Sequence, residues 1–154
     1  MKRVFPLFFV LLCPLLAEDA KRGVTIDAPI TNFRLTELSN EGFRSSLVRG
    51  SEAHYINDNQ IDLVGMQYTT FLENEAGDLD ATLLAPTATV FILNGKVNKV
   101  RGNESVRLIR KNIEVTGELW TYEHAEKNSS TPKKLVIEKN VHAIFRIEMK
   151  DILK

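Results

Sequence analysis

Apolar and polar residues alternate with a period of two along much of the chain after residue 30. The longest example is the stretch 141–149, in which every second residue is apolar (Val141, Ala143, Phe145, Ile147 and Met149). Alternate residues of a β-strand point to opposite faces, so this pattern places an apolar stripe on one side of a strand. After the first residues, no stretch keeps the apolar rhythm of an amphipathic helix for three turns. The pattern therefore predicts an all-β domain.

Short clusters of turn-forming residues separate the alternating stretches. They are Asn40-Glu41-Gly42, Asn57-Asp58-Asn59, Glu75–Asp78, Asn94-Gly95, Gly102-Asn103, Lys111-Asn112, Asn128–Pro132 and Lys139-Asn140. Asn and Gly tolerate the positive φ angles of tight hairpins, and Asn94-Gly95 is the strongest hairpin signal among them. This spacing predicts about ten short antiparallel strands in one domain. Leu79–Leu84 could instead form a helical turn, which Pro86 would end.

Two stretches are apolar on both faces of the predicted strand. One runs from Gly65 to Leu72 and the other from Leu83 to Leu93. A sheet with one solvated face does not need such strands, whereas a folded-over sheet or two-layer roll does. Burial of both faces within a β-sandwich is the alternative explanation.

The first residues resemble an export signal. Lys2 and Arg3 precede the apolar run Val4–Leu16, which is followed by Ala17 and then by acidic residues. The run is shorter than the roughly 20 apolar residues of a membrane-spanning helix and contains two prolines. We expect residues 1–17 to be a signal peptide cleaved after Ala17, with a retained anchor or lipidation at Cys13 as alternatives.

The remaining residues, 18–154, suit a single domain with its own core. Loss of residues 1–17 removes Lys2 and Arg3, so 18 basic residues face 20 acidic ones. That balance disfavours a nucleic-acid-binding protein. Cys13 is the only cysteine of the chain, which excludes a disulfide, a thiolate metal site and a cysteine nucleophile from residues 18–154.

Catalytic motifs are missing from the sequence. His54, His124 and His142 have no second histidine or acid at a spacing that suits a metal site or an oriented base. Asp78 and Asp80 would point the same way on a strand, but acids are ordinary in such a loop-like stretch. No nucleophile elbow or phosphate-binding loop occurs. The sequence therefore predicts a binding protein rather than an enzyme, with no cofactor and no metal.

Basic residues cluster between positions 96 and 111, where Glu104 is the only acid. The cluster consists of Lys96, Lys99, Arg101, Arg107, Arg110 and Lys111. Such a patch suits anionic head groups, and Lys99, Arg101 and Arg107 are the candidate contacts. A solvated rim of hairpins is the simpler explanation.

Several segments between Phe33 and Trp120 resemble the LptC family of lipopolysaccharide export proteins, within the LptA/LptC/OstA-like superfamily. They are Phe33-Arg34-Leu35, Asn40-Glu41-Gly42, Gly50–Tyr55, Leu84–Val90 and Val100–Leu108. The resemblance lies in their order and spacing. It implies a twisted, slit-like antiparallel β-roll, a jelly-roll variant, with an apolar groove for lipid acyl chains.

The resemblance also implies a setting and partners. A protein of this family works in the periplasm, where it passes lipopolysaccharide from an inner-membrane ABC transporter to an LptA-like bridge protein through pairing of edge strands. The edges expected to pair are Val24–Ile30 and Val141–Met149. Strand phase selects the candidate groove residues: Phe33, Leu35, Leu47, Tyr55, Leu63, Leu83, Val90, Leu108, Val115 and Phe145.

Two other functions remain open. A secreted structural or adhesion module without a lipid ligand predicts a tightly filled interior. A periplasmic hydrolase would need acids or histidines that converge in a cleft, and the sequence offers no such set.

Overall fold

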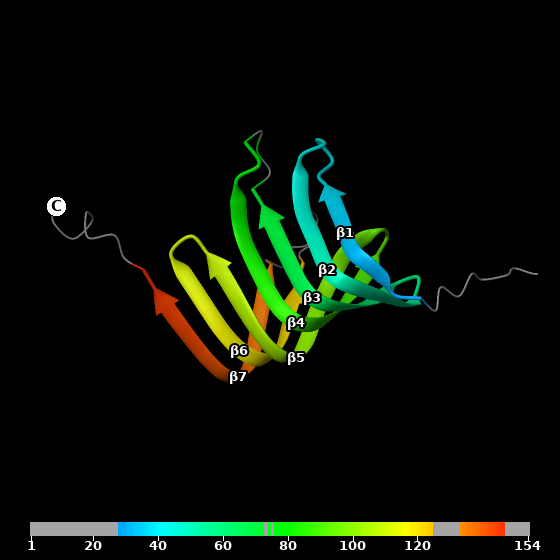
Figure 1. Cartoon of the computed structure of the whole chain (residues 1–154). Helices are drawn as coiled ribbons and strands as arrows, with labels where there is room; N and C mark the ends of the chain where they lie inside the picture. The colour runs from blue at the N-terminus through cyan, green and yellow to red at the C-terminus, as the bar shows by residue number, and fades with distance from the viewer. Residues whose placement is uncertain (1–27, 73, 75, 125–132, 147–154) are drawn as a thin grey trace, which may run out of the picture.

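The computed structural model describes residues 28–72, 74, 76–124 and 133–146, which form one curved antiparallel sheet (Figure 1). Its strands are β1 (Ile30–Leu38), β2 (Arg44–Asn57), β3 (Gln60–Phe71), β4 (Leu79–Leu93), β5 (Lys96–Arg110), β6 (Ile113–Glu123) and β7 (Lys134–Phe145). Each strand pairs with the next one along the chain, so the order in the sheet is the order in the sequence. The all-β prediction is confirmed.

The strands are fewer and longer than the sequence predicted. Seven strands of up to 15 residues lie in the described part of the chain, instead of about ten short ones. The difference arises because two predicted turns lie inside strands: Gly102-Asn103 in β5 and Lys139-Asn140 in β7. The hairpin at Asn94-Gly95 is confirmed, with positive φ at both residues. Leu79–Leu84 is the first part of β4 and not a helical turn.

The long strands bend where their alternation changes phase. Buried positions step by two within each half of a strand, but by three across its middle, from Leu63 to Met66 in β3 and from Ala85 to Ala88 in β4. The step in β3 contains Gly65, whose φ is +60°. An irregular residue bends a strand and reverses the facing of all later side chains. Both halves of the strand therefore turn their apolar side chains toward the same concave face.

Two apolar rows run across the strands on this concave face. The first row follows the pairing Leu35–Val48–Tyr68–Leu83–Leu108–Val115–Ala143 from β1 to β7. The second row follows Tyr55–Ile61–Val90–Val100–Tyr122–Leu135 from β2 to β7. We call the parts of the sheet that carry these rows the first and second arms.

The two arms pack against each other across the bend. The rings of Tyr68 in the first arm and Tyr122 in the second lie edge to face, with centroids 5.4 Å apart. Between them lies one cluster of buried side chains, including Val48, Leu83 and Val90. The apparent two-sided apolar character of β3 and β4 thus reflects one core that is reached from both halves of a folded sheet.

Some sequence predictions concern residues outside the described part. The signal segment 1–17, the docking edge 24–27 and the end of the last alternating stretch, Ile147–Met149, all lie there. Within the described residues, no helix is long or apolar enough to cross a lipid bilayer.

Substitution of Gly102 by alanine tests the packing at the bend. A Cβ on Gly102 would lie 2.5 Å from Nε1 of Trp120, its cross-strand neighbour. Because the indole is buried and cannot move freely, we expect Gly102→Ala to lower the free energy of unfolding by about 2 kcal/mol in urea titrations. Gly95→Asn, at a turn with open space around it, should cost less than about 1 kcal/mol. Equal costs would contradict the close packing.

Candidate functional site

The concave face is covered at one end of the sheet and uncovered at the other. Along the first row, Val48, Tyr68 and Leu83 are buried, Leu108 and Val115 are partly exposed, and Ala143 is exposed. Two residues beside Ala143 on the same face, Val141 and Phe145, are 57% and 66% exposed. Exposure therefore rises from strand to strand toward β7.

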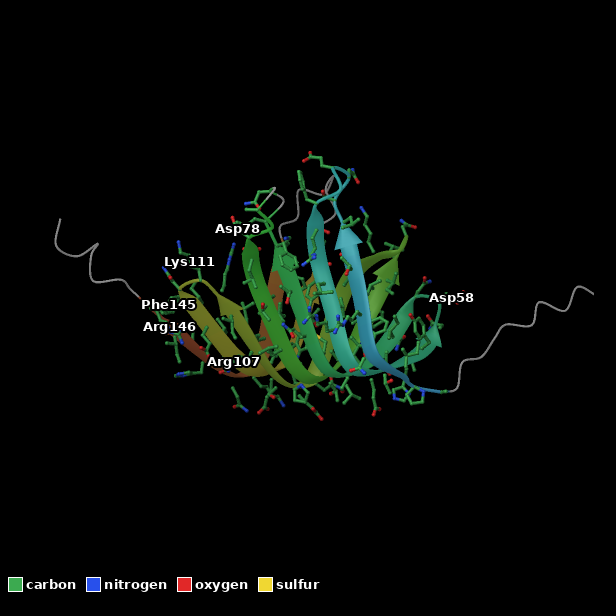
Figure 2. All side chains as sticks on the ribbon, turned by 45° about the horizontal axis from the view of Figure 1, so that its top comes forward. Asp58, Asp78, Arg107, Lys111, Phe145 and Arg146 are labelled. Atoms are coloured by element: carbon green, nitrogen blue, oxygen red, sulfur yellow. The ribbon has the colours of Figure 1, made fainter. Side chains whose placement is uncertain are left out.

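We call this uncovered region the open apolar face. It consists of Ile113, Val115, Val141, Ala143 and Phe145, together with Leu135 and Ile137, which also pack against the core at its border. Strand pairing places its members on the concave side, because Leu135 lies opposite Tyr122 and Phe145 lies opposite Ile113. Figure 2 shows Phe145 at the β7 end of the sheet. A contiguous exposed apolar surface of this kind is typical of a binding site for an apolar ligand or partner.

The open apolar face ends at a strand, β7, that has one unpaired edge. Among the described strands, β1 pairs only with β2 and β7 only with β6, so both have a free edge. β7 is 12 residues long, and every one of its residues is exposed or partly exposed. Such an edge offers free backbone donors and acceptors for pairing with another strand.

At the β1 end of the sheet, a buried carboxylate connects the two arms. Glu37 follows Leu35 in the alternation of β1 and therefore points to the concave side. Its Oε2 accepts a hydrogen bond of 2.5 Å from the Ser46 hydroxyl, and its Oε1 accepts one from the backbone N–H of Val97. Glu37 and Ser46 belong to the first arm and Val97 to the second, so the carboxylate joins the arms across their free ends.

Two tyrosines follow this carboxylate toward the middle of the sheet. We call Glu37, Tyr68, Tyr122 and the Asp80 cluster described next the polar layer. The Tyr68 hydroxyl lies 3.0 Å from Nδ1 of His124, which directly follows β6. Burial, Tyr122 and Glu37 raise the pKa of Tyr68. Burial, followed by the charge of Asp80, raises the pKa of Tyr122 to about 12. Both phenols are therefore neutral at physiological pH.

The last part of the layer is charged and borders the open apolar face. Asp80 Oδ1 lies 2.8 Å from Nη2 of Arg110, and its Oδ2 lies 4.0 Å from Nζ of Lys133. The Thr70 hydroxyl, which is fully buried, donates a hydrogen bond of 3.4 Å to the same Oδ2. Asp80 and Arg110 belong to the first arm, whereas Lys133 precedes β7 in the second.

The predicted groove residues fall into three groups. Leu63, Leu83 and Val90 are fully buried in the core, Phe33 is almost so, and Leu35 and Leu108 pack against it. Tyr55, Val115 and Phe145 lie on the concave side with some or much exposure. Leu47 is next to Val48 in β2 and points to the opposite, convex side. Only Val115 and Phe145 belong to the open apolar face.

The three predicted head-group contacts lie on the convex side. Lys99 pairs with Glu123 at 3.5 Å, and Arg107 pairs with Glu114 at 2.7 Å. The Arg101 guanidinium stacks on the ring of Phe91, 5.1 Å from its centroid. These cations are therefore separated from the open apolar face by the thickness of the sheet.

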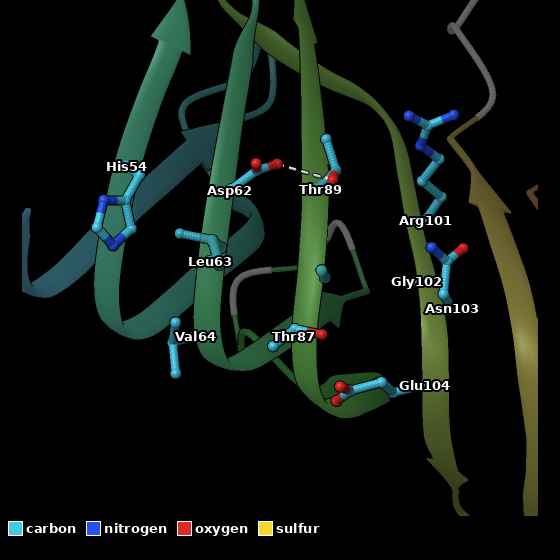
Figure 3. A pocket seen from close by; sticks show the side chains of 11 residues that line it. His54, Asp62, Leu63, Val64, Thr87, Thr89, Arg101, Gly102, Asn103 and Glu104 are labelled. Atoms are coloured by element: carbon cyan, nitrogen blue, oxygen red, sulfur yellow. Dashed lines mark hydrogen bonds between the residues drawn. The ribbon is translucent and has the colours of Figure 1, made fainter.

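Two shallow hollows of about 390 and 430 Å³ flank the bend between β4 and β5. Pairing of these strands is interrupted between Leu84 and Thr89, where Pro86 has no N–H to donate. Figure 3 shows the first hollow, in which Asp62 accepts a hydrogen bond of 2.7 Å from the Thr89 hydroxyl. His54 lies at its margin, 3.8 Å from Glu52. Glu104 is a second carboxylate that lines the same hollow.

Within the described residues, no group of three or more His, Cys, Asp or Glu side chains could hold a metal ion. Asp78 and Asp80, the acid pair considered from the sequence, have different partners. Asp78 accepts a hydrogen bond from the Asn74 side chain in the β3–β4 loop, whereas Asp80 faces Arg110 and Lys133.

Two features of the site were missed from the sequence. Glu37 occupies a core position of the alternation Phe33, Leu35, Glu37, and an acid at such a position was a usable signal. The Asp80–Arg110–Lys133 cluster joins residues up to 53 positions apart, and no local sequence pattern predicts it.

A scan against models of known protein families found no match, and neither did a search of curated proteins.

Removal of the Glu37 carboxylate tests its role as a tie between the arms. Glu37→Ala leaves the Ser46 hydroxyl and the Val97 N–H buried without their acceptor, so we expect a loss of about 2–4 kcal/mol in the free energy of unfolding. Glu41→Ala, at the exposed β1–β2 turn, should change it by less than about 0.5 kcal/mol. Urea titration of both variants provides the comparison; similar values would argue against the tie.

The tyrosines predict a loss of stability at high pH. The folded state favours neutral Tyr122, because its pKa is raised from 10.0 to about 12. Its contribution is complete below pH 10 and is lost as the pH rises toward 12, by on the order of 2 kcal/mol. Tyr122→Phe should lose less stability than the wild type between pH 9 and 11 in urea titrations. Parallel losses would show that other groups dominate.

Proposed function

We propose that this protein is an exported carrier of lipopolysaccharide, which binds lipid acyl chains on the open apolar face and hands them on in the periplasm. The observation that carries the proposal is the gradient of exposure along the concave face. The apolar surface of the core continues onto β6 and β7, where its side chains become exposed to solvent. The resemblance of Phe33–Trp120 to the LptC family adds the chemistry of the ligand.

The energetics suit a carrier of lipid chains. Burial of one methylene group contributes about 0.8 kcal/mol, so a chain of a dozen carbons has a barrier to leaving an apolar surface on the order of 10 kcal/mol. A lipid with several chains cannot cross water quickly against such a barrier. A surface that stays open at one edge allows the chains to move to a neighbouring apolar surface without full exposure to water.

The unpaired edges of β1 and β7 could pair with strands of partner proteins and so align them with this sheet. Strand addition at β7 would place another sheet directly beside the open apolar face, so that the two apolar surfaces become continuous. The partners proposed for the β1 and β7 edges are an inner-membrane ABC transporter and an LptA-like bridge protein. The proposal includes export by the segment 1–17.

One observation favours a second candidate function. The core between the arms is tightly filled from β1 to β5, with Val48, Tyr68 and Leu83 fully buried. That is the interior expected of a secreted structural or adhesion module without a lipid ligand. Under this alternative, the open apolar face would be covered by a protein surface.

Neighbouring residues of β7 provide a matched test. Phe145 lies on the open apolar face, whereas Ile144 is exposed on the other side of the same strand. Phe145→Asp places a charge where acyl chains would pack, so we expect it to weaken binding of lipopolysaccharide to the purified protein by at least about tenfold. Ile144→Asp should bind like the wild type, and both variants should unfold at similar urea concentrations.

Mass spectrometry of lipids that copurify with the protein completes the test. Wild type and Ile144→Asp should retain lipid and Phe145→Asp should not. If the wild type neither copurifies with lipid nor binds added lipopolysaccharide, the carrier proposal is wrong and the structural module is favoured.

A further inference from the structure

The charged end of the polar layer has the composition of an anion site. We propose that Arg110 and Lys133, held by Asp80 beside the open apolar face, bind a phosphate group of the lipid whose chains lie on that face. The inference rests on the proposed function and names the residues that would recognise the polar part of the ligand. They differ from the cations that the sequence suggested.

The position of Arg110 connects the cluster to the apolar surface. Strand pairing forms the row Ala81–Arg110–Ile113–Phe145 on the concave side. Arg110 is thus the direct cross-strand neighbour of Ile113, a member of the open apolar face. Figure 2 shows Lys111, the next residue, at the same end of the sheet as Phe145. A lipid with chains along Ile113 and Phe145 would have its polar group beside Arg110.

The burial of the three side chains favours a site over a solvated ion pair. The Asp80 side chain is only 14% exposed, whereas those of Arg110 and Lys133 are 60% and 39% exposed. The carboxylate therefore lies beneath the two cations and holds them from two different arms. A guanidinium has five N–H donors and an ammonium three, and one carboxylate cannot accept them all. The remaining donors and one net positive charge are available to a ligand.

Phosphate fits these donors better than a carboxylate ligand would. Its oxygens point in several directions, so they can accept from Arg110 in a bidentate manner and from Lys133 on the facing arm at the same time. Among the described residues, the neighbouring acids Glu114 and Asp78 have other partners. Glu114 lies on the convex side with Arg107 and Arg146, and Asp78 faces Asn74.

Substitution of Asp80 should raise the affinity for a phosphorylated lipid, whereas substitution of the two cations should lower it. The carboxylate competes with a phosphate for the same two cations, and it repels the incoming charge. Asp80→Asn keeps the size of the side chain and its contact with Thr70, but it removes both effects. We expect this variant to bind a phosphorylated lipid about threefold or more tightly than the wild type. A purely structural ion pair would give no gain of binding.

The experiment uses the 154-residue chain and two probes, lipid A with its phosphates and the same lipid after their removal. Arg110→Gln/Lys133→Gln should bind the phosphorylated lipid about tenfold more weakly and the phosphate-free lipid as the wild type does. The control is Lys99→Gln/Arg107→Gln, which removes the same charge from the convex side and should leave both affinities unchanged. Titration calorimetry with inorganic phosphate alone should show no tight binding.

Each contrary outcome identifies what has failed. If the wild type and all variants bind both lipids equally well, the anion site is wrong and the carrier function stands. If the convex-side control loses as much affinity as Arg110→Gln/Lys133→Gln, net charge and not this cluster attracts the lipid. Tight binding of inorganic phosphate alone would overturn the assignment to a lipid. If the wild type binds neither lipid, the carrier function fails and this inference fails with it.

Discussion

A change of phase in the middle of the long strands is the constraint on which the structure depends. A strand that alternates without interruption turns its apolar side chains to one side of a nearly flat sheet, and a single sheet of this kind has nothing to pack against. Here the alternation skips a residue where the strand bends, at Gly65 in β3 and beside Pro86 in β4. Each strand thereby contributes to both arms, and the sheet forms a core by folding onto itself.

The folded sheet is covered unequally because its strands follow one another in order. The arms converge at the β1 end, where Glu37 binds both of them, and in the middle, where Tyr68 contacts Tyr122 and His124. Near the start of β7, the ion pair of Asp80 with Lys133 also connects the arms. Trp120 and Tyr122 of β6 belong to the core, whereas Ile113 and Val115 of β6 and the apolar side chains of β7 lie at its margin. The same geometry that completes the core at one end exposes it at the other.

This asymmetry gives a physical basis for a carrier. The filled end supplies the stability of the domain, and the open end supplies an apolar surface that needs no cavity to be opened. The polar layer borders that surface. The apolar chains of an amphipathic ligand would therefore contact the apolar side chains, and its polar group would contact the charged ones. An adhesion module would need the filled end only, and the open apolar face would then require a protein partner of its own.

The sequence by itself determined the all-β class, the hairpin at Asn94-Gly95 and most of the concave stripe, because alternation and turn chemistry are local properties of the chain. It could not determine the number of strands, since Gly102-Asn103 and Lys139-Asn140 have the composition of turns but act as irregularities within strands. Only the tertiary structure decided which apolar residues are covered, as Leu83 and Phe145 have the same strand phase but lie at different distances from the margin of the sheet. It also brought Asp80, Arg110 and Lys133 together, because contact between two arms of a folded sheet depends on where the strands bend, and no single stretch of sequence contains that information.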